Sequence, residues 1–141
     1  MPHDSDSAVQ REAEIEILKG ISGLLGKPLG KRHIDLPGGT WVEVDGAAAD
    51  LSVFAEAFAH QGRMKGGQKR KVALDVLKLI TLQRVHPGAH LVLAFCDEAA
   101  MNSLTGWIAE AIETWKVDRM VAALEADLRA RLIEVQARQY R

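Results

Sequence analysis

The sequence predicts an α/β fold in which a mixed β-sheet of about four to five strands is flanked by α-helices. Three observations support this. Residues 8–25 and 68–85 carry apolar side chains at helical spacing. Residues 41–45 alternate between apolar and polar side chains, as in a strand with one buried face. Residues 90–96 form an apolar run bounded by turn residues, which is typical of a central, fully buried strand.

The first half of the chain is predicted to form one helix and three strands. Asp6 or Ser7 can cap a helix that runs to about Leu25. Residues 33–36 are a short possible strand, and Pro37-Gly38-Gly39 is a turn. Residues 40–47 and 52–59 are then expected to be the two strands of a hairpin. Residues 1–7 are polar, and we expect them to be disordered.

The second half alternates helices with strands. A helix is expected from Gln68 to about Val85, where His86-Pro87-Gly88 stops it. The buried strand at 90–96 follows, and then a helix that starts at Asn102 or Ser103 and runs through Trp115. A short strand at 116–122 and a last helix to Tyr140 complete the chain. The inward side chains of the 68–85 helix are expected to be Val72, Val76, Leu77, Leu79 and Ile80.

Composition predicts a single domain over residues 1–141. About half of the residues are apolar and a quarter are charged, and the net charge is −1, so no overall field draws the protein to nucleic acid or to a membrane. The sequence shows no signal peptide and no apolar stretch of membrane-spanning length, and we expect a cytoplasmic protein. The single cysteine, Cys96, is interpreted as a small core residue.

Three carboxylates are predicted to gather on the hairpin. A turn centred on Ala49 and Asp50 would place Glu43 opposite Glu56, with Asp45 on the same side of the ribbon. Val42, Val44, Val53, Ala55 and Ala57 would then face the other side. Clustered carboxylates repel one another, and a hard divalent cation such as Mg²⁺ would relieve that repulsion. The alternative is that the three acids form the solvated face of a two-stranded ribbon.

Two further features lie near this hairpin in the sequence. Of the acids on the first helix, Glu14 lies nearest the apolar stripe and is the one expected to reach over the sheet. A basic, glycine-containing loop follows the hairpin and opens the next helix, where free N–H groups attract anions. It is either a phosphate site or a solvated loop. Its cations are Arg63, Lys65, Lys69, Arg70 and Lys71. Lys71, Asp75 and Lys78 share one face of that helix and are expected to stabilise one another.

Over residues 8–140 the chain resembles the PD-(D/E)xK superfamily, whose members have the restriction-endonuclease-like fold. The resemblance lies in the order helix, hairpin with Asp and then Glu, helix and strand. Asp45 matches the family's aspartate, Glu56 matches the glutamate ten residues further on, and Glu14 matches the acid of the first helix. The lysine expected two residues after Glu56 is Phe58 instead. In the family this lysine positions or activates the attacking water, and some members supply it from the neighbouring helix.

The resemblance therefore implies a catalytic set and a cofactor. Glu14, Asp45 and Glu56 would hold Mg²⁺ or Mn²⁺, and Lys71, Lys65 or the amide of Gln68 would replace the missing lysine. Arg63, Lys65, Lys69 and Arg70 would contact the backbone of the nucleic acid, which we expect to be DNA.

Two functions from different classes follow from these residues. The first is a metal-dependent endonuclease that hydrolyses phosphodiester bonds. The second is a catalytically inactive relative that binds nucleic acid or a protein, because Phe58 replaces the lysine. Whether any amine reaches the carboxylates discriminates between them. Trp107 and Trp115 are interpreted either as core residues or as part of an interface, and a homodimer is expected.

Overall fold

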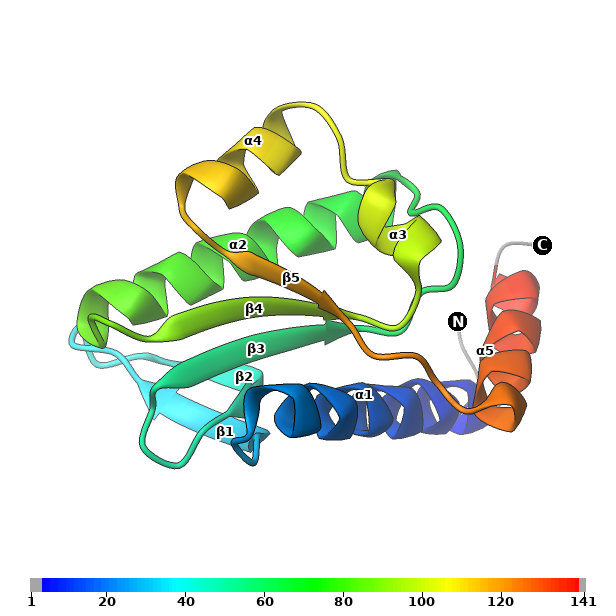
Figure 1. The fold of residues 1–141 in the computed structure, drawn as a ribbon, viewed down its shortest axis with the longest axis horizontal. Coiled ribbons are helices and arrows are strands. Elements are labelled where there is room, and N and C mark those ends of the chain that lie inside the picture. The colour runs from blue at the N-terminus through cyan, green and yellow to red at the C-terminus, as the bar shows by residue number, and fades with distance from the viewer. Residues whose placement is uncertain (1–3, 140–141) are drawn as a thin grey trace.

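A computed structural model describes residues 4–139 of the chain, which form a five-stranded mixed sheet between helices (Figure 1). The expected α/β architecture with helices flanking the sheet is thus confirmed. The helices are α1 (Asp4–Leu25), α2 (Gly66–Val85), α3 (Glu98–Asn102), α4 (Trp107–Thr114) and α5 (Ala126–Gln139). The strands are β1 (Gly30–Asp35), β2 (Trp41–Ala47), β3 (Val53–Phe58), β4 (His90–Phe95) and β5 (Asp118–Val121).

The strands lie in the sheet in the order in which they occur along the chain. β1 and β2 are antiparallel, and so are β2 and β3, because short turns connect them. β3, β4 and β5 are parallel, and their connections pass through α2 and then through α3 and α4. β3 and β4 are therefore central strands, which explains why nearly all of their residues are buried.

Two apolar cores cover the two faces of the sheet. On one face Val53, Ala55 and Ala57 of β3 pack under α1 with Ile17 and Ile21. On the opposite face Phe54 and Phe58 pack with α2 and α4. Because side chains alternate along a strand, Glu56 shares the α2 face with these two phenylalanines. A glutamate is thus placed among apolar side chains in the middle of the sheet.

Several expected boundaries differ from those observed. α1 already begins at Asp4, within the segment 1–7 expected to be disordered, and residues 1–3 lie outside the described part. Of the helix expected from 102 to 115, only α4 (Trp107–Thr114) is observed, because it begins after Gly106, whose φ of +70° suits glycine; the shorter α3 precedes the expected segment. Cys96 is buried as expected.

Some apolar side chains expected to be buried are exposed. Trp107 is 75% exposed and Trp115 is 53% exposed, so their interpretation as core residues is wrong. Leu77 of α2 is also exposed, because the buried stripe of this helix runs through Val72, Val76 and Leu79 and leaves Leu77 on the outer side. Tertiary packing, rather than side-chain character, decides which of these residues are covered.

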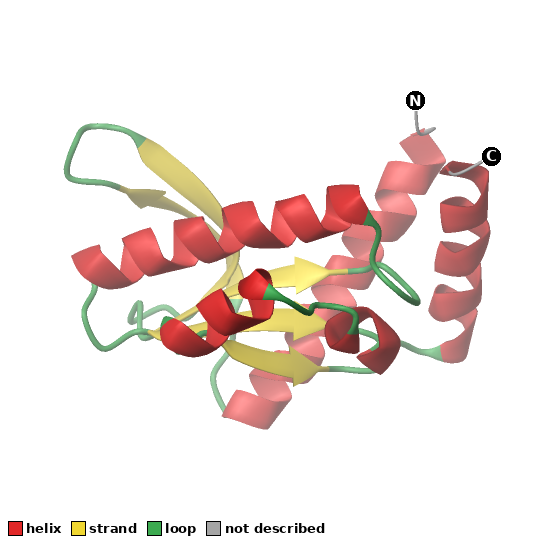
Figure 2. Cartoon of the chain, turned by 90° about the horizontal axis from the view of Figure 1, so that it is seen from above, coloured by secondary structure: helices red, strands yellow, loops and turns green. Residues whose placement is uncertain are grey.

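The β1–β2 hairpin extends beyond the helices, and Figure 2 shows its tip standing clear of α2. At the other end of the molecule, α5 lies beside the N-terminal part of α1 (Figures 1 and 2), and the two helices are joined by an ion pair between Arg131 and Glu12. No helix among the described residues is both long enough and apolar enough to cross a membrane.

Candidate functional site

The predicted pairing of β2 with β3 is wrong by two residues. Gly46 lies opposite Ala55 and Ala47 opposite Phe54, whereas the expected turn placed Asp45 opposite Phe54. The observed turn is one residue longer than expected, 48–52 instead of 48–51, and Ala48 closes it by donating its N–H to the carbonyl of Val53. Asp45 and Glu56 still meet, because the Asp45 side chain reaches β3, where it contacts Glu56 and the N–H of Ala57.

An irregularity in the pairing of β1 with β2 changes which residues lie close to Asp45. The register between β1 and β2 shifts by one residue where Arg32 pairs with Val44 and Gly30 pairs with Ala47. Such a bulge redirects side chains, and Val44 joins the core under α2 instead of facing away from Glu56. Glu43 is not part of the cluster, since its carboxylate lies 3.1 Å from Lys31 on β1. The expected group of Glu43, Asp45 and Glu56 is therefore only a pair.

Asp45 and Glu56 form a closely coupled pair of carboxyl groups. Glu56 is 1% exposed, and burial together with hydrogen bonding and charge repulsion from Asp45 raises its pKa to about 8. The Asp45 carboxylate also accepts a hydrogen bond of 2.9 Å from the N–H of Ala57. This bond fixes Asp45 against β3. At neutral pH the Glu56 carboxyl group is therefore mainly protonated.

An ammonium group reaches this pair from α2. Lys78 Nζ donates a 2.7 Å hydrogen bond to Glu56 Oε1 and a 3.0 Å bond to the carbonyl of Glu43. Burial lowers the pKa of Lys78, but the hydrogen bond to Glu56 and the nearby carboxylate charges together outweigh this effect, so the pKa is raised. The lysine therefore stays charged, and its ammonium group lies directly against the Glu56 carboxyl group.

Asp75 connects Lys78 with a second lysine. It is buried on α2, accepts two 2.7 Å bonds from Lys71 Nζ, and lies 3.8 Å from Lys78 Nζ. The mutual stabilisation expected for these three residues is confirmed. The role of Lys78 at Glu56 was missed from the sequence, although its helical spacing from Lys71 and Asp75 placed it on the correct face.

Glu14 and Asp45 border a hollow that opens to solvent. Its walls come from α1, the end of β3, the start of α2 and α5, and they include Glu14, Asp45, Phe58, His60, Gln68, Lys71 and Gln136. Burial and the charge of Asp45 raise the pKa of Glu14 to about 7, against the opposing effects of Lys31 and Lys71. Glu56 does not line the hollow and lies behind Asp45. Of the three acids proposed to bind metal, two face this hollow.

The residues proposed to replace the missing lysine lie in different places. Lys71 and Gln68 line the hollow, and Phe58, at the position of that lysine, lines it too. Lys65 precedes α2 and is exposed, and the side chain of Gln68 caps the helix by accepting a 2.8 Å bond from the Lys65 N–H. Lys71 is therefore the amine that the structure brings beside position 58. Of the residues proposed to contact nucleic acid, Arg63, Lys65 and Arg70 are exposed and Lys69 is half-buried, and none of them lines the hollow.

The wall formed by α5 was not predicted from the sequence. Gln136 accepts a 3.0 Å bond from the N–H of Gln61 and donates a 2.8 Å bond to its carbonyl, while Arg129 Nε donates to the Gln61 side chain. These bonds hold α5 on the loop between β3 and α2. The contacts join residues almost 70 positions apart or more, which no local pattern indicates.

The carboxylates of the hollow fit a small, hard cation. Among residues 4–139 no three His, Cys, Asp or Glu side chains are arranged as a metal site. Mg²⁺, however, commonly uses only one or two protein carboxylates and keeps several waters. Glu14 and Asp45 can supply these, with Glu56 behind Asp45. No protein-family model, curated protein or solved structure matches this chain.

Proposed function

We propose that this protein is a metal-dependent nuclease that hydrolyses phosphodiester bonds in nucleic acid at the hollow bordered by Glu14 and Asp45. The observation that carries the proposal is that lysine side chains of α2 lie close to the acidic residues of the site. Lys78 reaches Glu56, and Lys71 lies in the hollow beside the position where the related family has its lysine. The order α1, β1, β2, β3, α2, β4 supports a restriction-endonuclease-like core, because that family has its acids on the same elements.

Each side chain has a separate role in this proposal. Glu14 and Asp45 would hold Mg²⁺ or Mn²⁺, which when bound supplies a Lewis acid and a water of lowered pKa. Lys78 and Asp45 hold Glu56 in place from two sides. Lys71 is held in place by the two hydrogen bonds that it donates to Asp75, so its ammonium group can stabilise negative charge that develops on the phosphate.

The test combines a melting series with a cleavage assay. Mn²⁺ should raise the melting temperature of the parent protein, since a ligand that binds only the folded state stabilises it. Asp45→Asn should abolish that rise. Glu43→Gln is the matched control, because Glu43 lies two residues away on the same strand but pairs with Lys31 instead, and it should retain the rise in full. The absence of any Mn²⁺ effect on the parent would refute the metal site.

Cleavage of plasmid DNA and of RNA then separates the nuclease from an inactive relative. Lys71→Met should keep the Mn²⁺ stabilisation but lose most of the cleavage, about 10²-fold or more, as removal of a charge-stabilising group commonly does. Stabilisation by Mn²⁺ without cleavage of either substrate would instead favour the binding module. The inactive binding module stays a second candidate function because Phe58 stands where the resembled family has its lysine.

A further inference from the structure

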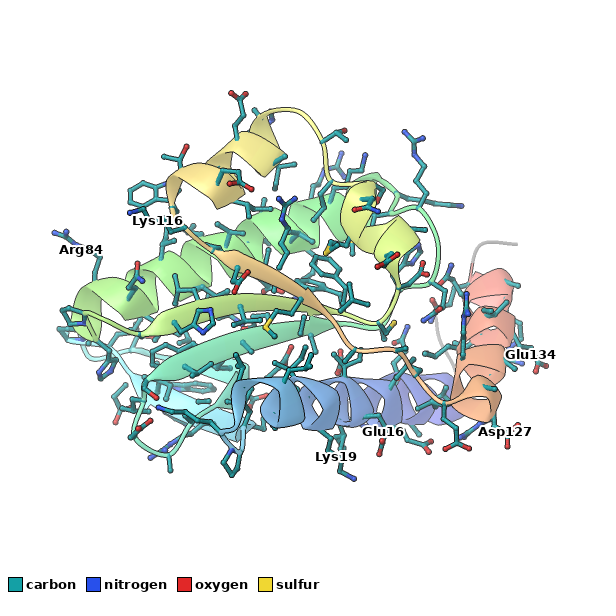
Figure 3. The ribbon with its side chains drawn as sticks, in the orientation of Figure 1. Glu16, Lys19, Arg84, Lys116, Asp127 and Glu134 are labelled. Carbon is teal, nitrogen blue, oxygen red and sulfur yellow. The ribbon has the colours of Figure 1, made fainter. Side chains whose placement is uncertain are left out.

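A second hollow adjoins the first on the far side of the two acids. It lies between α1 and β1 and shares Glu14 and Asp45 with the hollow described above. Its other walls include Arg11, Leu18 and Lys31. Lys19 also borders it, although Figure 3 shows that this side chain projects away from the sheet. The two acids therefore lie between two openings, and a chain-like substrate has space on both sides of them.

The outer face of the β1–β2 hairpin continues this second hollow. Ile34 faces the core under α2, so the alternation along β1 puts Lys31 and His33 on the opposite face. His33 stacks on Trp41 of β2 with ring centroids 4.2 Å apart and an angle of 28° between the rings. Trp41 is 53% exposed. A flat, partly uncovered aromatic surface thus lies four residues along β2 from Asp45, roughly 13 Å away.

The aromatic pair is held by a tight turn. Leu36 donates its N–H to the carbonyl of Thr40, and Gly39 donates its N–H to the carbonyl of Leu36. Gly39 has a φ of +91°, which glycine adopts without strain. Trp41 follows this turn directly, so its backbone is fixed before any ligand arrives. A preorganised ring loses little freedom on binding.

We propose that the stacked His33–Trp41 pair is a platform on which unpaired bases of a nucleic-acid strand stack as the strand enters the site. Bases stack on exposed aromatic rings in proteins that bind single strands, irrespective of sequence. Paired bases inside a duplex do not present their faces, so the platform selects unpaired segments. This inference rests on the proposed function, because it takes nucleic acid as the substrate.

The charges of this face indicate that stacking, rather than phosphate contact, supplies the affinity. Lys31 is paired with Glu43, and Asp35 lies 3.3 Å from His33, so positive and negative groups alternate there. Few counterions would be released when a strand binds. The salt dependence of binding is therefore expected to come from the basic loop before α2 and not from the hairpin.

The test measures binding of fluorescein-labelled dT20 and of a 20-base-pair duplex by anisotropy in EDTA. Trp41→Ala should weaken binding of dT20 about 5- to 100-fold, as loss of base stacking does, with an unchanged salt slope. Trp115→Ala is the matched control, since Trp115 is equally exposed, 53%, but lies on the opposite side of the sheet, after α4. It should bind like the parent. Equal affinities of the two variants for dT20 would overturn the platform, and so would an equal loss of duplex binding.

A second measurement does not depend on removing Trp41. In a chain carrying Trp107→Phe and Trp115→Phe, Trp41 is the only tryptophan, and stacked bases should quench its fluorescence when dT20 is added. Unchanged fluorescence at saturating dT20 would overturn the proposal. Because EDTA removes metal from both measurements, a protein that binds through Trp41 but does not cleave would refute only the nuclease. A protein that cleaves but ignores Trp41 would refute only the platform.

Discussion

Replacement of Glu56 by glutamine is expected to stabilise the metal-free protein at neutral pH. Glutamine has the shape of a protonated glutamate, and it can still donate to Asp45 and accept from Lys78. In the fold the pKa of Glu56 is raised from the usual 4.5 to about 8. A raised carboxyl pKa contributes stability that is complete below pH 4.5 and is lost as the pH rises through 8. Glutamine never ionises, so the variant should keep this contribution at every pH.

The magnitude follows from the pH interval. Each pH unit above 4.5 costs the parent about 1.4 kcal/mol relative to the variant, until Glu56 ionises in the fold as well. At pH 5 the two proteins should therefore differ by less than about 1 kcal/mol, and at pH 7 by about 3 kcal/mol. For a chain of this length that difference corresponds to roughly 10 °C in melting temperature. These values are upper limits, because any residual structure in the unfolded chain reduces them.

The assay is urea unfolding followed by far-ultraviolet circular dichroism at pH 5, 6, 7 and 8 in EDTA. The difference between parent and variant isolates Glu56, since Glu14, whose pKa is also raised, is present in both. Glu110→Gln, on the exposed side of α4, is the control and should follow the parent. Parallel stability curves for the parent and Glu56→Gln would show that the fold does not raise the pKa of Glu56.

Three further outcomes are expected from the packing and the charges. Gly20→Ala in α1 should destabilise the fold by about 1–3 kcal/mol, because the added methyl group would lie 2.6 Å from Cβ of Ala122. Gly23→Ala on the same helix adds a methyl group that meets nothing within 4 Å, and it should stabilise the fold by about 0.5–1 kcal/mol. Urea titrations measure both changes. Burial raises the pKa of Cys96 to about 11, so iodoacetamide should label it at pH 8 only after unfolding, as mass spectrometry would show. Charge reversal of the cations that open α2 should weaken binding of dT20 and flatten its salt dependence, and an unaltered slope would exclude them as the phosphate site. These cations are Lys65, Lys69 and Arg70.

Local patterns in the sequence were enough to predict most of the elements. The apolar run that became β4 and the periodic helices α1 and α2 were found because each buries a face in a simple repeat. The interpretation of Trp107 and Trp115 as core residues was wrong because both look apolar without being covered. A pattern identifies apolar residues but cannot identify which of them finds a partner.

The candidate site was predicted less completely than the fold. Asp45 and Glu56 were correctly predicted to meet, although the predicted register was wrong by two residues and Val44, expected to face away from Glu56, lies on its face. The exclusion of Glu43 depends on an irregular pairing with β1, which the alternation of residues 41–45 did not indicate. The Gln61–Gln136 contact that places α5 at the hollow joins distant segments, and only the folded chain reveals it.

Phe58 stands where the family that the sequence resembles has a lysine, and α2 supplies amines nearby. Phe58 is 7% exposed and stacks on Phe95 with ring centroids 5.2 Å apart, so a lysine there would lose water and this apolar contact. Lys71 and Lys78 are two helical turns apart and therefore lie on one face of α2. The buried Asp75 lies between them, where it accepts hydrogen bonds from Lys71 at the hollow and lies near Lys78. One lysine on a strand can serve only one position. Two lysines on a helix allow one ammonium group to contact Glu56 behind Asp45 while the other faces the hollow, and position 58 is left to the core.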